Sequence, residues 1–240
     1  MYPILFKIGP ISIHSYGVML AIAFLVATFL AKRRAITAGI DGNIILDLAI
    51  YLITSGILGA RLLYVFLNLG YYKENPLEII MIWRGGLVWY GGFILAIFLA
   101  IWFLKAKKLP ILKTGDLIIP YVALGQAIGR IGCFLNGCCY GKPTSLPLGV
   151  TFDPALGSVH PTQLYESAAM FLIFLILKGR MPGDGKTIFL YLISYSIFRF
   201  FNEFLRGDVP QVLVGLTVSQ IISIVVLLTT IIVWKNLPSR

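Results

Sequence analysis

The stretch GGLVWYGGFILAIFLAIWFL, from Gly85 to Leu104, decides the class of this protein, because its 20 residues carry no charge. About 20 apolar residues let a helix cross a hydrocarbon core of about 30 Å. The rest of the chain has the same character, since 58% of the 240 residues are hydrophobic, only 12% are charged and the mean hydropathy is +0.89. A water-exposed surface cannot be built from this composition. The sequence therefore predicts an integral membrane protein.

Six more apolar runs, bounded by charges or turn residues, flank this stretch. The seven runs are Tyr16–Ala31, Ile44–Leu69, Gly85–Leu104, Leu117–Leu135, Gln163–Leu177, Ile188–Leu205 and Val212–Trp234. We expect an all-α integral membrane protein of about seven transmembrane helices, forming a single polytopic domain over residues 1–240. Three cysteines are too few for a disulfide framework. No signal peptide is expected, because only Lys7 precedes the first run.

Positive charges are unevenly distributed between the two ends of these runs. The connections after the first, third and fifth runs, together with the tail residues Lys235 and Arg240, hold 12 of the 20 lysines and arginines. Cytoplasmic loops of membrane proteins carry the excess of Lys and Arg, so we expect the N-terminus outside and the C-terminus in the cytoplasm. The net charge of +10 is then interpreted as a mark of basic loops held against the anionic inner leaflet, and no nucleic-acid partner is expected.

Three arginines, Arg61, Arg130 and Arg199, lie inside predicted spans. Each costs at least about 2.5 to 3.5 kcal/mol at mid-membrane unless it faces the protein interior or water, although snorkelling to the interface is the alternative. In the expected topology all three fall in the outer half. Other polar residues expected at this level are His14, Tyr16, Tyr64, Tyr90, Gln126, Asn136, His160, Gln163, Tyr165, Glu166, Tyr195, Glu203 and Arg206.

The inner half of the predicted spans is poorer in charged residues and contains only Asp47 and Asp116. We expect each aspartate in the first turn of a helix, where the helix dipole stabilises a carboxylate at little desolvation cost. The sequence therefore predicts the functional site near the outer face.

Helical spacing indicates that the outer polar residues share a pocket. Tyr195, Arg199 and Glu203 recur at i, i+4 and i+8, so they lie on one stripe, and we expect Arg199 to pair with Glu203. Gln126 and Arg130 have the same i, i+4 spacing. The nearby Gly125, Gly129 and Gly132 are interpreted either as plain helix packing or as a close approach for a ligand.

The charge of this pocket indicates what it binds. Arg61, Arg130, Arg199 and Arg206 against Glu166 and Glu203 leave about +2. Guanidinium groups match phosphate oxygens, so the site suits an anionic phospholipid headgroup. The repeated halves and broken midplane helices of a transporter are not evident. The residues alone therefore predict a phosphate-handling membrane enzyme or a lipid-binding protein.

The three cysteines, Cys133, Cys138 and Cys139, fall within seven residues. Such a group of thiols allows three functional interpretations, namely a metal site with His160, a redox pair or a catalytic thiolate. C-x-x-C spacing is absent and there is no second pair of thiols. The favoured interpretation is small side chains that fit a crowded helix end, with no metal bound.

The stretch around these cysteines, GRIGCFLNGCCYG from Gly129 to Gly141, resembles the signature G-R-x-G-N-F-x-N-x-E-x-x-G of the bacterial prolipoprotein diacylglyceryl transferases. Other blocks are similar to that family in its order, and together they cover nearly the whole chain. These blocks are IHSYG (Ile13 to Gly17), GAR (Gly59 to Arg61), GGLVWYGG (Gly85 to Gly92), HPTQLYE (His160 to Glu166), Tyr195 to Arg206 and GLTVSQ (Gly215 to Gln220).

The resemblance implies a seven-helix enzyme of the bacterial inner (plasma) membrane, with its active site toward the outer leaflet. It implies transfer of diacylglyceryl from phosphatidylglycerol to the lipobox cysteine of prolipoprotein signal peptides, with release of glycerol phosphate and without a metal or cofactor. We expect four residues to be catalytic: Arg130, Arg199, Tyr90 and Glu203. We expect the following residues to bind substrate: Tyr16, Arg61, Asn136, Gly141, His160, Gln163, Glu166, Tyr195 and Arg206.

Three positions depart from the family pattern. Tyr90 stands where the family usually has a histidine, and Cys133 and Cys138 stand where its signature has Asn and Glu. Loss of the histidine removes the obvious general base. We nevertheless expect activity, because a thiol is partly ionised at neutral pH and nearby arginines favour the thiolate. The alternatives are a non-catalytic anionic-lipid binder or flippase, and a paralogous lipid transferase with another acceptor.

Overall fold

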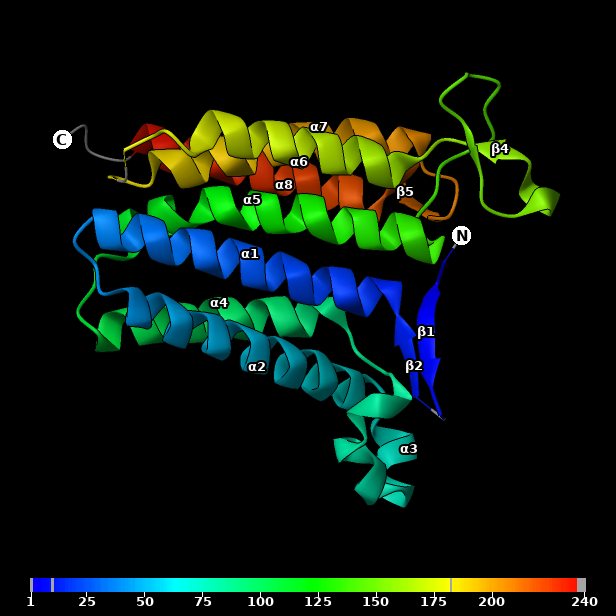
Figure 1. The fold of residues 1–240 in the computed structure, drawn as a ribbon, viewed down its shortest axis with the longest axis horizontal. Coiled ribbons are helices and arrows are strands. Elements are labelled where there is room, and N and C mark those ends of the chain that lie inside the picture. Colours follow the sequence, from blue (N-terminus) through cyan, green and yellow to red (C-terminus); the bar gives the residue numbers. More distant parts are fainter. Residues whose placement is uncertain (1, 10, 182, 237–240) are drawn as a thin grey trace. The chain divides into compact units, whose positions relative to one another are not determined.

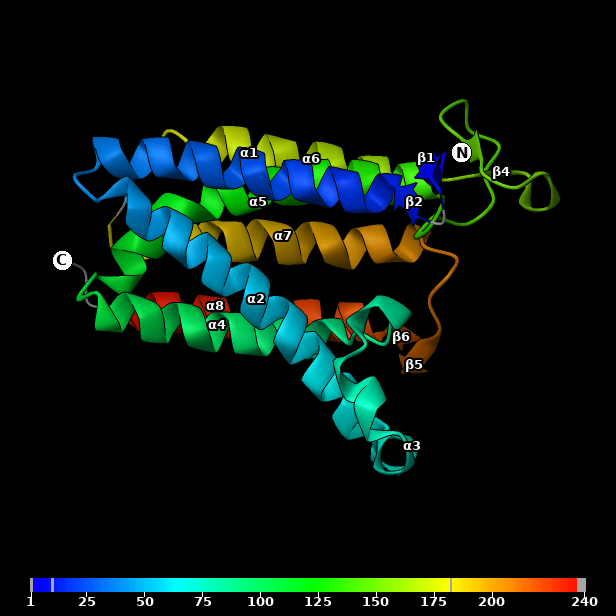
Figure 2. The same cartoon turned by 60° about the horizontal axis from the view of Figure 1, so that its bottom comes forward.

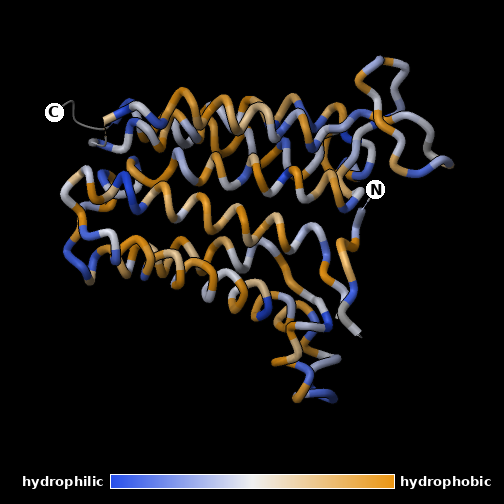
Figure 3. Tube along the Cα trace, viewed as in Figure 1, coloured by the Kyte–Doolittle hydropathy of each residue, from blue (hydrophilic) through white to orange (hydrophobic). Residues whose placement is uncertain are grey.

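The computed structural model describes residues 2–9, 11–181 and 183–236, and Arg240 of the predicted cytoplasmic tail lies outside them. The fold is predominantly helical, and Figure 3 shows that the long helices are hydrophobic over most of their length. Within the described residues, six helices are long and apolar enough to cross a membrane. They are α1 (Ser15–Thr37), α2 (Gly42–Leu67), α4 (Trp89–Ala106), α5 (Ile111–Asn136), α7 (Lys186–Leu205) and α8 (Val218–Asn236).

The predicted run Gln163–Leu177 forms α6 (Thr162–Leu177), which is apolar but has only 16 residues. At 1.5 Å per residue such a helix is about 24 Å long, less than the hydrocarbon core of a bilayer. The multi-pass membrane character predicted from composition is confirmed. The seventh crossing stays a prediction.

Two helices begin several residues after the start of the apolar runs that predict them. The helix expected from Gly85 begins at Trp89, because Gly85 and Gly86 take positive φ values of 83° and 71° that an α-helix does not tolerate. The helix expected from Val212 begins at Val218. Before it, β5 (Gln211–Leu213) and β6 (Leu216–Thr217) form a short antiparallel hairpin. Apolar letters alone do not distinguish such a hairpin from the helix that follows it.

The expectation that Asp47 and Asp116 occupy first helical turns is wrong. Their helices begin at Gly42 and Ile111, so both residues lie in a second turn. The carboxylate of Asp116 is buried and accepts hydrogen bonds of 2.9 to 3.0 Å from the backbone N–H groups of Gly183, Gly185 and Ile188. Asp116 therefore binds the start of α7, whose first N–H groups lack intrahelical partners.

The chain forms two compact units. The helix-pair unit, residues 32–111, contains α2, α4 and between them α3 (Leu69–Glu74), η1 (Pro76–Ile80) and η2 (Ile82–Arg84). Helices α2 and α4 cross at Gly59 and Gly91, where the backbones approach so closely that a Cβ built on Gly59 would lie 2.7 Å from the Cβ of Leu95. Glycine is required at this crossing because no larger residue fits.

The bundle unit consists of residues 2–31 and 112–236. Helices α5, α6, α7 and α8 run side by side with the first part of α1 (Figures 1 and 2). Its core is formed by side chains of α5, α6 and α7: Ala123, Leu124, Ala127, Met170, Ile173, Phe174, Leu177 and Tyr191.

Short hairpins lie at one end of this bundle unit, as both views show. They are β1 (Ile4–Ile8) with β2 (Ile11–His14), β3 (Val150–Thr151) with β4 (Ser158–Val159), and β5 with β6, and η3 (Pro154–Leu156) joins β3 to β4. At this end α5 and α7 finish and α1, α6 and α8 begin. Most of the polar residues predicted for the site fall at this end, so the bundle brings them together. Arg61, Tyr64 and Tyr90 instead belong to the helix-pair unit.

Candidate functional site

Glu166, on α6, is the centre of a buried ionic cluster in the bundle unit. It is 1% exposed, and its two carboxylate oxygens contact two arginines from neighbouring helices. Arg130 Nη2 of α5 lies 2.9 Å from Oε1, and Arg199 Nη1 of α7 lies 3.4 Å from Oε2. The hydroxyl of Tyr195 also donates to Oε1 at 3.4 Å. A buried charge is tolerated when it is paired and hydrogen-bonded, and the two arginines meet this condition for Glu166.

The predicted pairing of Arg199 with Glu203 is confirmed. Arg199 Nη2 lies 2.7 Å from Glu203 Oε2, and Glu203 is 3% exposed. The same Nη2 donates to Ser219 Oγ at 3.1 Å, while Thr217 Oγ1 donates to Glu203 Oε1 at 2.9 Å. The hairpin residue Thr217 and the first turn of α8 therefore fix both members of the pair.

Thr217 and Ser219 were not among the predicted site residues. The signal was nevertheless present, because both belong to the block GLTVSQ that resembles the family. Gln220 of the same block is 1% exposed, and its Oε1 accepts a hydrogen bond of 3.0 Å from the backbone N–H of Thr217. The block thus holds Thr217 in place for Glu203.

Gln126 and Arg130 share a helix face, as their spacing predicts, but they have different partners. Arg130 pairs with Glu166, whereas Gln126 accepts a hydrogen bond from the hydroxyl of Tyr191. The side chain of Arg130 is 24% exposed, compared with 11% for Arg199. Arg130 is therefore the more accessible of the two guanidinium groups around Glu166.

The glycines beside Arg130 differ in what they contact. A Cβ built on Gly132 would lie 2.9 Å from the Cβ of Met19 on α1, and one on Gly125 would lie 3.5 Å from the Cβ of Ala27. A Cβ on Gly129 would meet no atom of the described residues within 4 Å. The packing interpretation holds for Gly125 and Gly132, while Gly129 faces open space next to Arg130.

The loop after α5 is anchored to α6 by the predicted residue Gln163, whose Nε2 donates to the carbonyl of Cys138 at 2.6 Å. Thr162 Oγ1 donates to the carbonyl of Cys139 at 2.7 Å. The backbone N–H of Gly141 donates to the carbonyl of His160 at 2.8 Å, and a Cβ on Gly141 would lie 2.6 Å from the Cβ of His160. Gly141 and Gln163 thus hold this loop against the start of α6.

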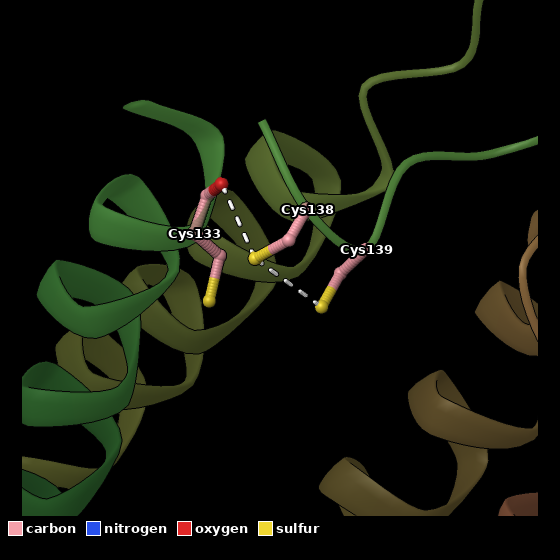
Figure 4. A group of neighbouring side chains, drawn as sticks. All are labelled: Cys133, Cys138 and Cys139. Carbon is pink, nitrogen blue, oxygen red and sulfur yellow. Dashed lines mark hydrogen bonds between the residues drawn. The ribbon is translucent and has the colours of Figure 1, made fainter. Parts of the chain in front are cut away.

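The three cysteines meet where α5 joins this loop (Figure 4). Their Sγ atoms all lie within 4.8 Å of one another, and the sulfurs of Cys138 and Cys139 are 3.8 Å apart. Cys139 lies outside the spanning helices. A hydrogen bond from the Cys133 thiol, together with the positive charges of Arg206 and Arg130, lowers the pKa of Cys139 to about 5 against the opposing effect of burial. The surroundings of Cys139 therefore favour its thiolate form over that of an ordinary thiol.

The other predicted residues of the bundle unit lie at the same end of the unit as the ionic cluster and the cysteines. Tyr16, the second residue of α1, lies beside Gly132 and is 42% exposed, while Asn136 is the last residue of α5. His160 Nδ1 lies 3.3 Å from the hydroxyl of Tyr165. Arg206 forms two hydrogen bonds with Asp208, from Nε at 2.9 Å and from Nη2 at 2.7 Å.

The expected charge of about +2 is not found within the bundle unit. Its three site arginines, Arg130, Arg199 and Arg206, are matched by three carboxylates, those of Glu166, Glu203 and Asp208. Arg61, one of the four arginines behind the expected charge, belongs to the other unit, and Asp208 adds a carboxylate that the expectation did not include. The cluster is therefore neutral before any substrate binds.

Arg61 and Tyr90 belong to the helix-pair unit. Arg61 is 6% exposed, and its guanidinium donates to four backbone carbonyls, those of Glu78, Ile79, Gly85 and Gly86. These bonds organise the segment between α2 and α4. The segment and the end of α2 line a cavity of about 590 Å³, whose lining residues are Arg61, Tyr64, Asn68, Tyr71, Tyr72, Glu78, Arg84, Gly85 and Gly86. Tyr90 is 44% exposed.

Comparisons with known proteins give the family. The sequence model of the family described as "Prolipoprotein diacylglyceryl transferase" matches residues 3–235. A protein of Clostridium tetani is 40% identical over 243 residues, covering 98% of this chain and 97% of the relative. A protein of Finegoldia magna is 41% identical, with 95% and 92% covered, and one of Staphylococcus aureus is 36% identical, with 95% and 86% covered. All three are named phosphatidylglycerol--prolipoprotein diacylglyceryl transferase. The chain therefore belongs to the prolipoprotein diacylglyceryl transferase family.

Proposed function

We propose that the protein transfers the diacylglyceryl group of phosphatidylglycerol to the lipobox cysteine thiol of a prolipoprotein. The names of its relatives support this reaction. The observation that carries it is the pair of guanidinium groups, Arg130 and Arg199, held at opposite oxygens of the buried Glu166. Guanidinium groups are the side chains best suited to bind a phosphate.

Arg130 is the residue that would first meet the lipid phosphate. It is the more exposed of the two, and one of its nitrogens contacts Glu166. A guanidinium has five N–H donors, so Arg130 retains donors for phosphate oxygens. Because the cluster is neutral, the phosphate competes with Glu166 for Arg130, and Glu166 keeps Arg199 as a partner when it loses that contact.

In the reaction, the acceptor thiolate attacks the glyceryl carbon that carries the phosphate. The new S–C bond forms as the C–O bond breaks, and the bonding electrons leave on the phosphate oxygen of glycerol phosphate. Arg130 and Arg199 stabilise the charge that develops there, and Glu203 with Thr217 orients Arg199. Tyr90 donates a hydrogen bond to a substrate oxygen.

The acceptor needs no strong base, because a free thiol is partly ionised at neutral pH and the arginines favour its thiolate. No cysteine of the enzyme carries the lipid. A diacylglyceryl group on an enzyme thiol would be a thioether, which has no good leaving group for a second displacement. Direct attack by the acceptor avoids this dead end.

The remaining binding residues have two roles in this proposal. Tyr16, Asn136, His160 and Tyr195 line the approach to Arg130. Gly141, Gln163 and Arg206 fix the loops around the site, and Arg61 fixes the segment that follows α2. These residues act by positioning their neighbours.

The proposed placement is a single polytopic domain in the bacterial inner (plasma) membrane, with seven crossings that include the short α6. The N-terminus lies outside, the C-terminus lies in the cytoplasm and the site opens toward the outer leaflet. The concentration of Lys and Arg in the loops opposite the site supports this orientation.

A reconstituted transfer assay tests the function. The purified full-length protein in phosphatidylglycerol vesicles should add one diacylglyceryl mass to the cysteine of a lipobox peptide, measured by mass spectrometry, and a peptide with serine at that cysteine is the control. Scrambling or binding of phosphatidylglycerol without transfer would favour a lipid binder or flippase and would refute the proposal.

A further inference from the structure

The cysteine cluster has features that the transfer reaction does not use. Cys133 comes from the last turns of α5, and Cys138 and Cys139 come from the loop that follows. Their three Sγ atoms lie within 4.8 Å of one another, with 3.8 Å between Cys138 and Cys139, and they point into one space (Figure 4). Packing alone does not require three sulfurs to converge.

The backbone that carries these thiols is held in place before any ligand arrives. Cys139 has φ of 65°, a left-handed conformation that costs a non-glycine residue about 1 to 2 kcal/mol. Hydrogen bonds from the Thr162 and Gln163 side chains to the carbonyls of Cys139 and Cys138 maintain it. The backbone N–H of Cys138 also donates to the carbonyl of Cys133 at 3.2 Å. The backbone positions of Cys138 and Cys139 are therefore set by the fold.

The distances fit a three-coordinate cation. A cation about 2.3 Å from each of three sulfurs, at the centre of their triangle, requires sulfur to sulfur distances of about 4 Å. Cys138 and Cys139 already have this spacing, and a closure of less than about 1 Å brings Cys133 to it. Among the described residues, no His, Asp or Glu joins the three thiols.

We propose that Cys133, Cys138 and Cys139 form a site for a soft, thiophilic monovalent cation, Cu⁺, bound by three thiolates. Thiolates select Cu⁺ and Zn²⁺ among the common metal ions, but structural Zn²⁺ takes four ligands and this group offers three. Binding releases to solvent the protons that the thiols still carry. The complex carries a charge of −2, which the adjacent cations Arg130 and Arg206 neutralise in part, since both interact electrostatically with Cys139.

The site has a consequence for transfer, and this consequence, unlike copper binding itself, rests on the proposed function. A complex of charge −2 attracts the guanidinium of Arg130 and competes with the lipid phosphate for it. The metal-free protein is therefore the active form, and Cu⁺ inhibits it. A chelator that removes Cu⁺ restores the rate.

Copper binding is tested on the full-length protein in detergent, anaerobically, in reductant and without an affinity tag. Cu⁺ is supplied as its complex with bicinchoninate, whose loss of colour reports transfer of the metal to the protein. We expect one Cu⁺ per chain, and X-ray absorption should show three sulfur neighbours. The chain has only these three cysteines, so their joint replacement by serine should abolish binding.

The matched control is Asp153→Asn, which removes a carboxylate from the same outer loop region and should leave copper binding unchanged. Equal Cu⁺ uptake by the triple serine variant, or no uptake by the wild type, would overturn the proposal. Zn²⁺ binding without Cu⁺ binding would overturn it as well. Cu⁺ binding without inhibition of transfer would refute only the proposed effect on activity.

Discussion

Replacing Arg199 by lysine tests whether the site needs a guanidinium or only a positive charge. In the structure, Nη1 of Arg199 contacts Glu166 while Nη2 contacts both Glu203 and Ser219. An ammonium has one nitrogen, so it cannot reach both carboxylates as the two nitrogens do. At least one charge-assisted hydrogen bond is lost, at about 1.5 to 3 kcal/mol. Since 1.4 kcal/mol is a factor of ten, kcat/KM for transfer should fall about 10- to 150-fold.

The assay is diacylglyceryl transfer to a lipobox peptide in phosphatidylglycerol vesicles, with thermal unfolding in detergent to show that each variant folds. Arg84→Lys is the matched control, because Arg84 forms an exposed ion pair with Glu78, and it should retain activity within about twofold. The Arg130→Lys variant is expected to lose kcat/KM by a factor in the same range as the Arg199→Lys variant. Near-normal rates for both site variants would show that simple charge attraction suffices and would refute the argument from guanidinium geometry.

Asp116→Asn should lower the free energy of unfolding by about 3 kcal/mol, because the amide NH₂ must face at least one backbone N–H that the carboxylate now accepts. The midpoint temperature of thermal unfolding would then drop by about 6 to 12 °C. An unchanged midpoint would contradict the role of Asp116 in capping α7. Gly132→Ala should cost about 1 to 3 kcal/mol, because its Cβ would overlap α1, whereas Gly129→Ala meets open space and should not destabilise. Equal stabilities of these two variants would disprove the packing argument. Tyr90→Phe should lower the transfer rate without shifting its pH profile, which follows the acceptor thiol. A shifted profile would indicate that Tyr90 acts as a base.

Composition and periodicity were enough to predict the class of fold. In lipid, an uncharged run can satisfy its backbone hydrogen bonds only as a helix, as the part of Gly85–Leu104 from Trp89 onward does. The class of helical membrane protein therefore follows from the local sequence. The pairing of Arg199 with Glu203 was also predictable, because residues four apart on a helix are neighbours. The ordered blocks predicted the family, which the comparisons confirm.

Contacts between distant segments were decided by the tertiary structure. Glu166 meets Arg130 because α5 and α6 pack together, and no spacing in the sequence specifies that contact. Arg61 is predicted to bind substrate, and the structure adds that its donors reach four carbonyls of the segment that follows its helix. Asp116 likewise binds the start of another helix. A charged side chain in a membrane pairs with whichever polar group the packed backbone brings within reach. The sequence therefore shows that the side chain needs a partner, but only the packing determines which residue that partner is.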